Sequence, residues 1–221
     1  MDIRLLIFDL DGTLIDSKLD LANAVNAARA SLRLGPMDHD TISSYIGNGA
    51  PMLIRRALGP DFEEEDVARA LEFFLGYYRQ HKLDNTRLYP GVREALNSFG
   101  DRILVVLTNK PVRISREILE GLGASGYFRC VFGGNSFETK KPHPEGVQNI
   151  LEDSGVPPDQ AMIVGDSDVD VLTGRNAGIH TCGVTYGFAP HTFETHPPDL
   201  LVRDLGELAA LLDQPSSNQE R

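Results

Sequence analysis

Residues 3–13 form the stretch IRLLIFDLDGT, in which an apolar run ends in two aspartates and a glycine. Such a run is typical of a buried strand, and the carboxylates of Asp9 and Asp11 emerge where that strand ends. Gly12 permits a tight turn directly after it. Two acids at a strand end are more often a helix-capping turn than a functional site, so further motifs are needed before a function can be inferred.

Further apolar runs predict additional strands, which lie at 103–107, 161–164 and 181–184, with a weaker one at 131–132. Helical patterns lie between and beside these strands, at about 91–99, 112–122, 144–154 and 168–177. This alternation predicts an α/β fold with a doubly wound, Rossmann-like parallel sheet covered on both faces. Ligands of such folds bind at the carboxyl ends of the strands, so we expect the polar motifs to gather there.

Residues 17–85 break the alternation, because they carry helical periodicity without a convincing strand. Turn signals divide this segment into about four helices. We therefore interpret residues 1–16 and 86–213 as the α/β core and residues 17–85 as an inserted α-helical cap domain. The polar residues 214–221 are expected to form a frayed tail.

Composition limits the classes of partner. The 221 residues include 21 Lys and Arg against 32 Asp and Glu, which gives a formal net charge of −11 and argues against binding to nucleic acid. No stretch approaches the roughly 20 apolar residues that a membrane span requires, so we expect no membrane association and a cytoplasmic protein, monomeric or homodimeric. Cys130 and Cys182 lack redox or metal-site spacing and are expected to be reduced thiols.

A second group of acids follows the strand expected at 161–164. The sequence there is GDSDVD, residues 165–170, and it brings Asp166 and Asp170 to the presumed carboxyl edge of the sheet. Like charges gathered in a dry crevice need a neutralising cation or partial protonation. Oxygen ligands without nearby His or Cys favour Mg²⁺ over zinc or copper.

Two other polar segments contribute hydrogen-bond donors and positive charge. Thr108 and Asn109 follow the second strand of the core, and the pair Lys140 and Lys141 precedes a later helix. Alone, each is a weak signal, since the lysines would ordinarily be a solvated basic pair. Together with the acids they supply what phosphoryl transfer requires: an attacking oxygen, a cation, donors to the phosphoryl oxygens and a proton-transfer group.

In this order, DLDGT at 9–13, LTN at 107–109, KKPHP at 140–144 and GDSDVD at 165–170 resemble the four motifs of the haloacid dehalogenase superfamily. The resemblance covers nearly the whole chain and implies the core of that superfamily with a helical cap over the site. A small phosphorylated metabolite is the implied substrate, because such a cap excludes water and bulky phosphoproteins.

The resemblance also implies roles for individual residues. Asp9 would be the nucleophile that forms an aspartyl-phosphate, and Asp11 the general acid that protonates the leaving oxygen and then activates water. Thr108 and Lys141 would hold the phosphoryl oxygens, with Asn109 adjacent. Lys141 is preferred to its neighbour because the lysine of this motif directly precedes the proline.

For the metal, the resemblance implies that Mg²⁺ is coordinated by the Asp9 carboxylate, the backbone carbonyl of Asp11 and Asp166. Asp170 would lie in or next to the coordination sphere. The dehalogenases themselves lack a second acid and need no metal. Because this sequence has Asp11 at that position, the resemblance favours a phosphomonoesterase. A mutase of the β-phosphoglucomutase type shares these motifs, so it stays an alternative, as does a phosphatase acting broadly on sugar phosphates or pyrophosphate.

A phosphoacceptor signalling module is an alternative of another class. Receiver domains also combine clustered acids, Mg²⁺, a threonine and a lysine, but they are compact single domains of roughly half this length. The acid pair of this chain and the long insertion do not match that arrangement.

Within the expected cap, YIGNG at residues 45–49 resembles the cap loop of phosphoglycolate phosphatases, and LTNKP, KKPHP and TYG at 185–187 share this resemblance. It implies hydrolysis of 2-phosphoglycolate to glycolate and phosphate. Gly47 and Asn48 are then candidate substrate-binding residues. The alternative is that this loop is only a turn between helices.

Arg55 and Arg56 follow the cap loop and are further candidates, because a guanidinium can bind a substrate carboxylate through two hydrogen bonds. A solvated helix face is the alternative for at least one of them.

Overall fold

The core is one sheet of six parallel strands, which follow each other in the order β5-β4-β1-β6-β7-β8. The computed structural model describes residues 1–213 and gives the strands these bounds: β1 Leu5–Phe8, β4 Ile103–Leu107, β5 Cys130–Phe132, β6 Ala161–Gly165, β7 His180–Val184 and β8 Leu200–Val202. The predicted tail, 214–221, lies outside the described residues. In chain order this is the 3-2-1-4-5-6 arrangement of a doubly wound sheet, which confirms the predicted fold class.

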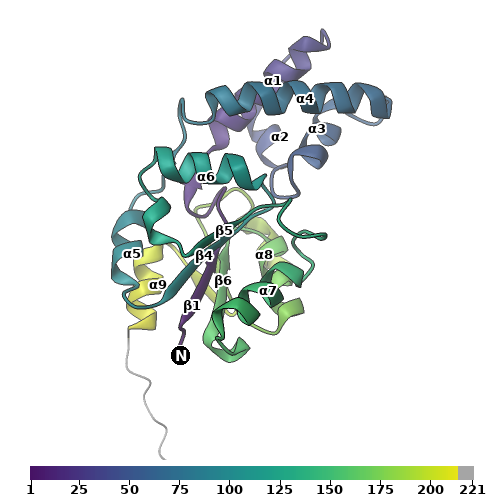
Figure 1. Cartoon of the computed structure of the whole chain (residues 1–221). Helices are drawn as coiled ribbons and strands as arrows, with labels where there is room; N and C mark the ends of the chain where they lie inside the picture. The colour runs from purple at the N-terminus through teal and green to yellow at the C-terminus, as the bar shows by residue number, and fades with distance from the viewer. Residues whose placement is uncertain (214–221) are drawn as a thin grey trace, which may run out of the picture.

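Helices cover both faces of the sheet (Figure 1). On one side lie α5 Val92–Ser98, α6 Val112–Gly121 and α9 Leu205–Leu212, and on the other lie α7 Glu145–Ser154 and α8 Asp168–Ala177. Side chains of β1 alternate between the two apolar clusters: Leu6 and Phe8 join one, and Leu5 and Ile7 join the other. Both faces of the strand are therefore buried, which explains its uninterrupted apolar sequence.

The segment predicted as a cap contains four helices, α1 Lys18–Ser31, α2 His39–Ser43, α3 Ala50–Leu58 and α4 Glu64–His81. They lie beyond one end of the sheet, above α6 in Figure 1. In α4 the buried residues Val67, Ala70, Phe74 and Tyr78 recur at helical spacing, because this face packs inside the cap. Among residues 1–213, no helix is both long enough and apolar enough to span a membrane.

Short elements complete the described chain. Strands β2 Ile15–Asp16 and β3 Arg87–Leu88 pair antiparallel where the chain leaves and re-enters the core. The single-turn helices are η1 Ser125–Tyr127, η2 Pro158–Gln160 and η3 Pro190–Glu194. Strands β2, β3 and β8 were not predicted; β2 and β3 have two residues each, too few to establish a strand periodicity.

Asp20, on α1, binds the segment that precedes β3, where the chain returns from the cap to the core. Its buried carboxylate accepts hydrogen bonds at 2.8–3.0 Å from the backbone and side chain of Asn85, and at 2.8 Å from the backbone and hydroxyl of Thr86. Burial alone would raise the pKa of Asp20, but these hydrogen bonds outweigh it and hold the pKa below its ordinary value. The ionised carboxylate thus ties together residues that are 65 positions apart in the chain.

We predict that Asp20→Ala lowers the free energy of unfolding by about 2–3 kcal/mol, because it leaves buried donors without an acceptor. Asp40→Ala is the control. It removes an exposed ion pair with Lys18 and should cost less than about 1 kcal/mol. Urea denaturation of both variants measures the difference, and equal losses would contradict the anchoring role of Asp20.

Candidate active site

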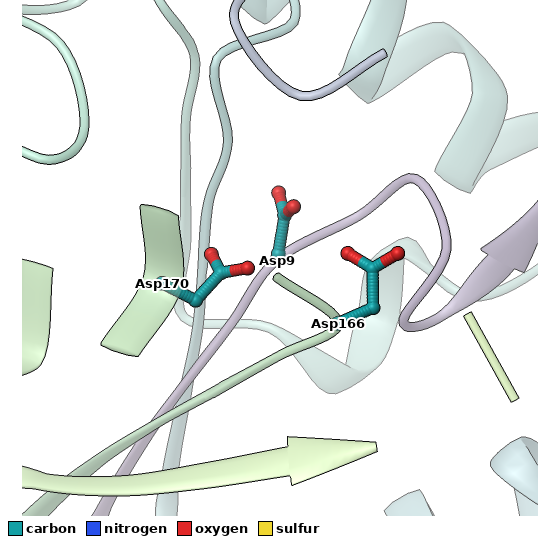
Figure 2. A group of neighbouring side chains, drawn as sticks. All are labelled: Asp9, Asp166 and Asp170. Carbon is teal, nitrogen blue, oxygen red and sulfur yellow. The ribbon is translucent and has the colours of Figure 1, made fainter. Parts of the chain in front are cut away.

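Three aspartates meet at the carboxyl edge of the sheet (Figure 2). Asp9 directly follows β1, Asp166 directly follows the neighbouring β6, and Asp170 lies in the first turn of α8. All three are buried, and each offers a carboxylate oxygen within 4.8 Å of the others. Because β1 lies between β4 and β6, this cluster sits where the winding of the sheet reverses, the usual ligand position in such folds.

Two glycines allow the carboxylates to pack this closely. Gly12 has a φ of +81°, and a Cβ on it would lie 2.2 Å from an oxygen of Asp166. A Cβ on Gly165 would lie 2.0 Å from the carboxyl carbon of Asp170. Any larger residue at either position would displace an acid, so both glycines are required by the site, and Gly12 also by the turn.

Lys141 is the lysine that enters the acid cluster. Its Nζ lies 2.6 Å from Asp170 and 3.0 Å from Asp9, whereas Lys140 is exposed. Burial opposes the charge of Lys141, but the two carboxylates outweigh that effect and raise its pKa above the ordinary value. Lys141 therefore stays protonated and offsets part of the negative charge.

The acids nevertheless hold more negative charge than Lys141 neutralises. Burial raises the pKa of Asp9 to about 6, with Asp170 adding to the rise and Lys141 opposing it. Burial also raises the pKa of Asp166, to which the charges of Asp170 and Asp9 contribute. Ionising both groups at neutral pH is costly without a further cation.

The donor set fits a hard divalent cation. Asp9 Oδ1 lies 3.0 Å from Lys141 Nζ but makes no hydrogen bond within residues 1–213, so a buried carboxylate oxygen stays available. Three carboxylates without His or Cys match the oxygen preference of Mg²⁺. This cluster could bind a metal through Asp9, Asp166 and Asp170.

Asp11 stands apart from the three acids. Its carboxylate accepts a hydrogen bond of 2.5 Å from Ser17 and bonds of 2.8 and 2.9 Å from the ammonium of Lys110. Lys110 is buried, and its contact with Asp11 was not predicted from the sequence. The structure thus holds the second acid of the DLDGT motif in a fixed position beside the cluster.

Thr108 and Asn109 follow β4, next to Asp9. Thr108 is buried beside the acids, and its Oγ1 accepts a bond of 3.3 Å from the backbone of Lys110. The Asn109 amide donates to the carbonyl of Lys141 at 3.1 Å and to the carbonyl of Gly47 at 2.9 Å. Asn109 therefore joins the core site to the YIGNG loop of the cap.

A cavity lies between cap and core. Its cap wall is formed mainly by apolar side chains, namely Leu21, Ile46, Leu53, Phe74, Leu75 and Tyr78. Its core wall contains Asp9, Asp11, Thr108, Asn109, Lys110 and Asp166. Of the cap-loop candidates, Gly47 lines this cavity, and Asn48 is not among its lining residues within the described chain.

The structure does not bring Arg55 or Arg56 to this cavity. Arg55 donates to the carbonyl of Phe62 at 2.7 Å and pairs with Glu64, both within the cap. Arg56 is exposed and donates to the carbonyl of Tyr45 at 3.3 Å. Both guanidinium groups thus bind cap residues.

Three contributors to the site were missed by sequence reasoning. The backbone N–H of Phe188 donates to Asp166 at 2.6 Å, and Lys110 lies over the ring of Tyr78, 4.6 Å from its centroid. For Lys110 the available signal was its place directly after Thr108 and Asn109. For Phe188 and Tyr78 no sequence signal existed, because their contacts depend on how distant segments fold together.

The chain is similar to known proteins over most of its length. Residues 6–184 match the family model of the haloacid dehalogenase-like hydrolases. The chain is 38% identical over 216 residues to a phosphoglycolate phosphatase of Chromobacterium violaceum, covering 95% of this chain and 96% of the relative. It is 40% identical over 197 residues to one of Psychrobacter arcticus, covering 85% and 86%.

A solved structure described as a predicted phosphoglycolate phosphatase from Haemophilus somnus superposes with a TM-score of 0.90. The sequence identity is 31%, and the match covers 96% of this chain and 98% of that one.

We predict that Mg²⁺ raises the melting temperature at pH 8 and has little effect at pH 5. With a pKa of about 6, Asp9 is mostly protonated at pH 5, and without metal its ionisation costs the fold stability as the pH rises from about 4 through 6. At a concentration 100 times Kd, the metal should add about 2.7 kcal/mol, or about 5–10 °C.

Thermal melts with and without Mg²⁺ measure this effect. Asp166→Asn should abolish the shift, whereas Asp168→Asn, which alters a neighbouring acid outside the cluster, should retain it. A shift of equal size at both pH values would contradict binding to these carboxylates.

Proposed function

The chain belongs to the haloacid dehalogenase-like hydrolase family, and within it we propose a Mg²⁺-dependent phosphomonoesterase that hydrolyses 2-phosphoglycolate to glycolate and phosphate. The observation that carries the proposal is the position of Asp9: its buried carboxylate lies beside Lys141 and two further acids and lines the cavity under the cap. The residues proposed as nucleophile, cation ligands and hydrogen-bond donors thus lie together at the carboxyl edge of the sheet.

Asp9 would act as the nucleophile. One of its carboxylate oxygens forms a bond to phosphorus as the bond from phosphorus to the ester oxygen breaks, which gives an aspartyl-phosphate. The ammonium of Lys141 lies 3.0 Å from Asp9, and Thr108 lines the same cavity as Asp9, so both would stabilise negative charge on the phosphoryl oxygens.

Asp11 would transfer the proton. It donates a proton to the ester oxygen as that oxygen leaves, which produces the hydroxyl of the alcohol product. It then accepts a proton from a water molecule, whose oxygen bonds to phosphorus as the bond to Asp9 breaks. Phosphate and the free Asp9 carboxylate result, and Lys110 and Ser17 hold Asp11 in place for both steps.

Asp9, Asp166 and Asp170 would hold Mg²⁺, and the family resemblance adds the backbone carbonyl of Asp11. When bound, the ion supplies positive charge that lets the carboxylates and the phosphoryl group lie together. The capping box of α8 orients Asp170, because Asp170 accepts hydrogen bonds from the backbone and hydroxyl of Ser167.

The choice of 2-phosphoglycolate is supported by the two relatives and by the cap. Both relatives carry the name phosphoglycolate phosphatase and align over most of this chain. The hydrogen bond from Asn109 to Gly47 brings the cap against the site, so the space beside Asp9 suits a small metabolite.

The proposal is tested by phosphate release from 2-phosphoglycolate, glucose phosphates, nucleoside monophosphates and pyrophosphate, with and without Mg²⁺. We predict that kcat/KM for 2-phosphoglycolate exceeds the others by at least about tenfold and requires the metal. A flat profile would indicate a broad phosphatase. Labelling of Asp9 without steady release would indicate a mutase or a phosphoacceptor.

We further predict that Asp9→Asn lowers kcat by about a thousandfold or more, because the amide is a poor nucleophile. Its circular dichroism should match that of the native protein. Asp168→Asn provides the matched control and should retain activity, since its carboxylate lies outside the acid cluster. Comparable losses in both variants would contradict the assignment of Asp9.

A further inference from the structure

The walls of the cavity are unevenly charged. Those of its lining residues that carry a negative charge are Asp9, Asp11 and Asp166, and the cap wall is mainly apolar. Among the lining residues within 1–213, Lys110 is the one cation. A substrate with a second anionic group, besides its phosphoryl group, therefore has one charged partner available on these walls.

Lys110 retains hydrogen-bonding capacity. An ammonium group has three N–H donors, and the two oxygens of Asp11 account for at most two of them. Its Nζ also lies 4.6 Å from the centroid of the Tyr78 ring, an arrangement that favours the charged form. Burial opposes this charge, but Asp11 and Tyr78 outweigh it and raise the pKa of Lys110 above its ordinary value.

Tyr78 adds a second free donor from the cap. It lies on α4, its side chain is 1% exposed, and the proton of its hydroxyl has no acceptor among residues 1–213, since the neighbouring ammonium of Lys110 can only donate. Burial raises the pKa of Tyr78 to about 12, so the hydroxyl keeps its proton and can donate. A buried hydroxyl proton without an acceptor is unusual, and a bound ligand would provide the missing acceptor.

We propose that Lys110 and Tyr78 together form the carboxylate-binding site of the substrate cavity, with the ammonium contributed by the core and the hydroxyl by the cap. The proposal rests on the proposed function and specifies how the substrate is selected. It assigns to these two residues the recognition that sequence reasoning had sought in Arg55 and Arg56, which bind cap residues instead.

The geometry also selects the position of the carboxylate. Lys110 Nζ lies 2.8 Å from the carboxylate of Asp11, the group proposed to protonate the ester oxygen. An anion bound by Lys110 is thus held close to that oxygen. In 2-phosphoglycolate a single methylene separates the ester oxygen from the carboxylate, so Asp11 and Lys110 can contact the two groups at once.

The site spans both domains and therefore links recognition to closure of the cap. Lys110 Nζ lies over the ring of Tyr78 because α4 packs against the core. A carboxylate substrate would favour that arrangement, whereas a phosphoester without a carboxylate would gain nothing from it.

The test compares 2-phosphoglycolate with ethyl phosphate, which has the same two-carbon skeleton without the carboxylate. The ratio of their kcat/KM values in the presence of Mg²⁺ is the readout. We expect this ratio to fall at least about tenfold in Lys110→Met and about three- to tenfold in Tyr78→Phe. Tyr77→Phe is the matched control, because Tyr77 neighbours Tyr78 on α4 but does not line the cavity; its ratio should not change.

Because Lys110 is buried, Lys110→Met could fail to fold, and Tyr78→Phe tests the site independently of that variant. It removes one oxygen and leaves the stack of this ring on Phe74, whose centroid lies 5.6 Å away. Equal losses on both substrates in Lys110→Met would show that Lys110 acts only through Asp11 and would overturn the proposal. A ratio in Tyr78→Phe equal to that of Tyr77→Phe would overturn it as well.

Failure of the proposed function is distinguishable from failure of this site. If the native protein released phosphate from ethyl phosphate but showed no preference for 2-phosphoglycolate, the result would support phosphatase activity and contradict the carboxylate-binding site. If neither substrate were hydrolysed, titration calorimetry of 2-phosphoglycolate into Asp9→Asn would decide. Binding that weakens at least about tenfold when Lys110→Met is added supports the site, and unchanged binding overturns it.

Discussion

Mutual repulsion of three buried carboxylates is the constraint on which the rest of the site depends. Asp9, Asp166 and Asp170 are held within 4.8 Å by the pairing of β1 with β6 and by the start of α8. Lys141 offsets part of their charge, whereas burial, with the neighbouring carboxylates adding to it, raises the pKa values of Asp9 and Asp166. The fold supplies the free energy that keeps these groups together, and a divalent cation would relieve the cost.

Two contacts between cap and core run through the loop after β4. Asn109 reaches the backbone of Gly47, and its neighbour Lys110 lies over Tyr78. Both residues also bind members of the core site, since Asn109 contacts Lys141 and Lys110 contacts Asp11. A shift of the cap would therefore alter the surroundings of Asp11, the proposed proton-transfer group, and also the space for the substrate.

Much of the core could be predicted from the sequence, because buried parallel strands are uninterrupted apolar runs and their ends carry the motifs. The predicted strand at 103–107 matches β4, and the doubly wound fold is confirmed. The two-residue strands β2 and β3 were missed, since such short elements depend on each other's pairing rather than on a local pattern.

The site was harder to predict where side chains choose among partners. The environment of Lys110 depends on its burial between Asp11 and Tyr78, which come from distant segments. Conversely, Arg55 looked suitable for a carboxylate but pairs with Glu64 inside the cap. The local sequence shows which side chains are charged, whereas tertiary packing determines which partner each of them binds.

The central claim is that Asp9 receives the phosphoryl group beside a metal held by the clustered acids. A crystal structure with Mg²⁺ and beryllium trifluoride, a mimic of a phosphoryl group, tests it most directly. The account predicts the beryllium of that group bonded to a carboxylate oxygen of Asp9, with Mg²⁺ about 2.0–2.1 Å from oxygens of Asp9 and Asp166. An adduct on another residue, or a metal bound away from these acids, would contradict it.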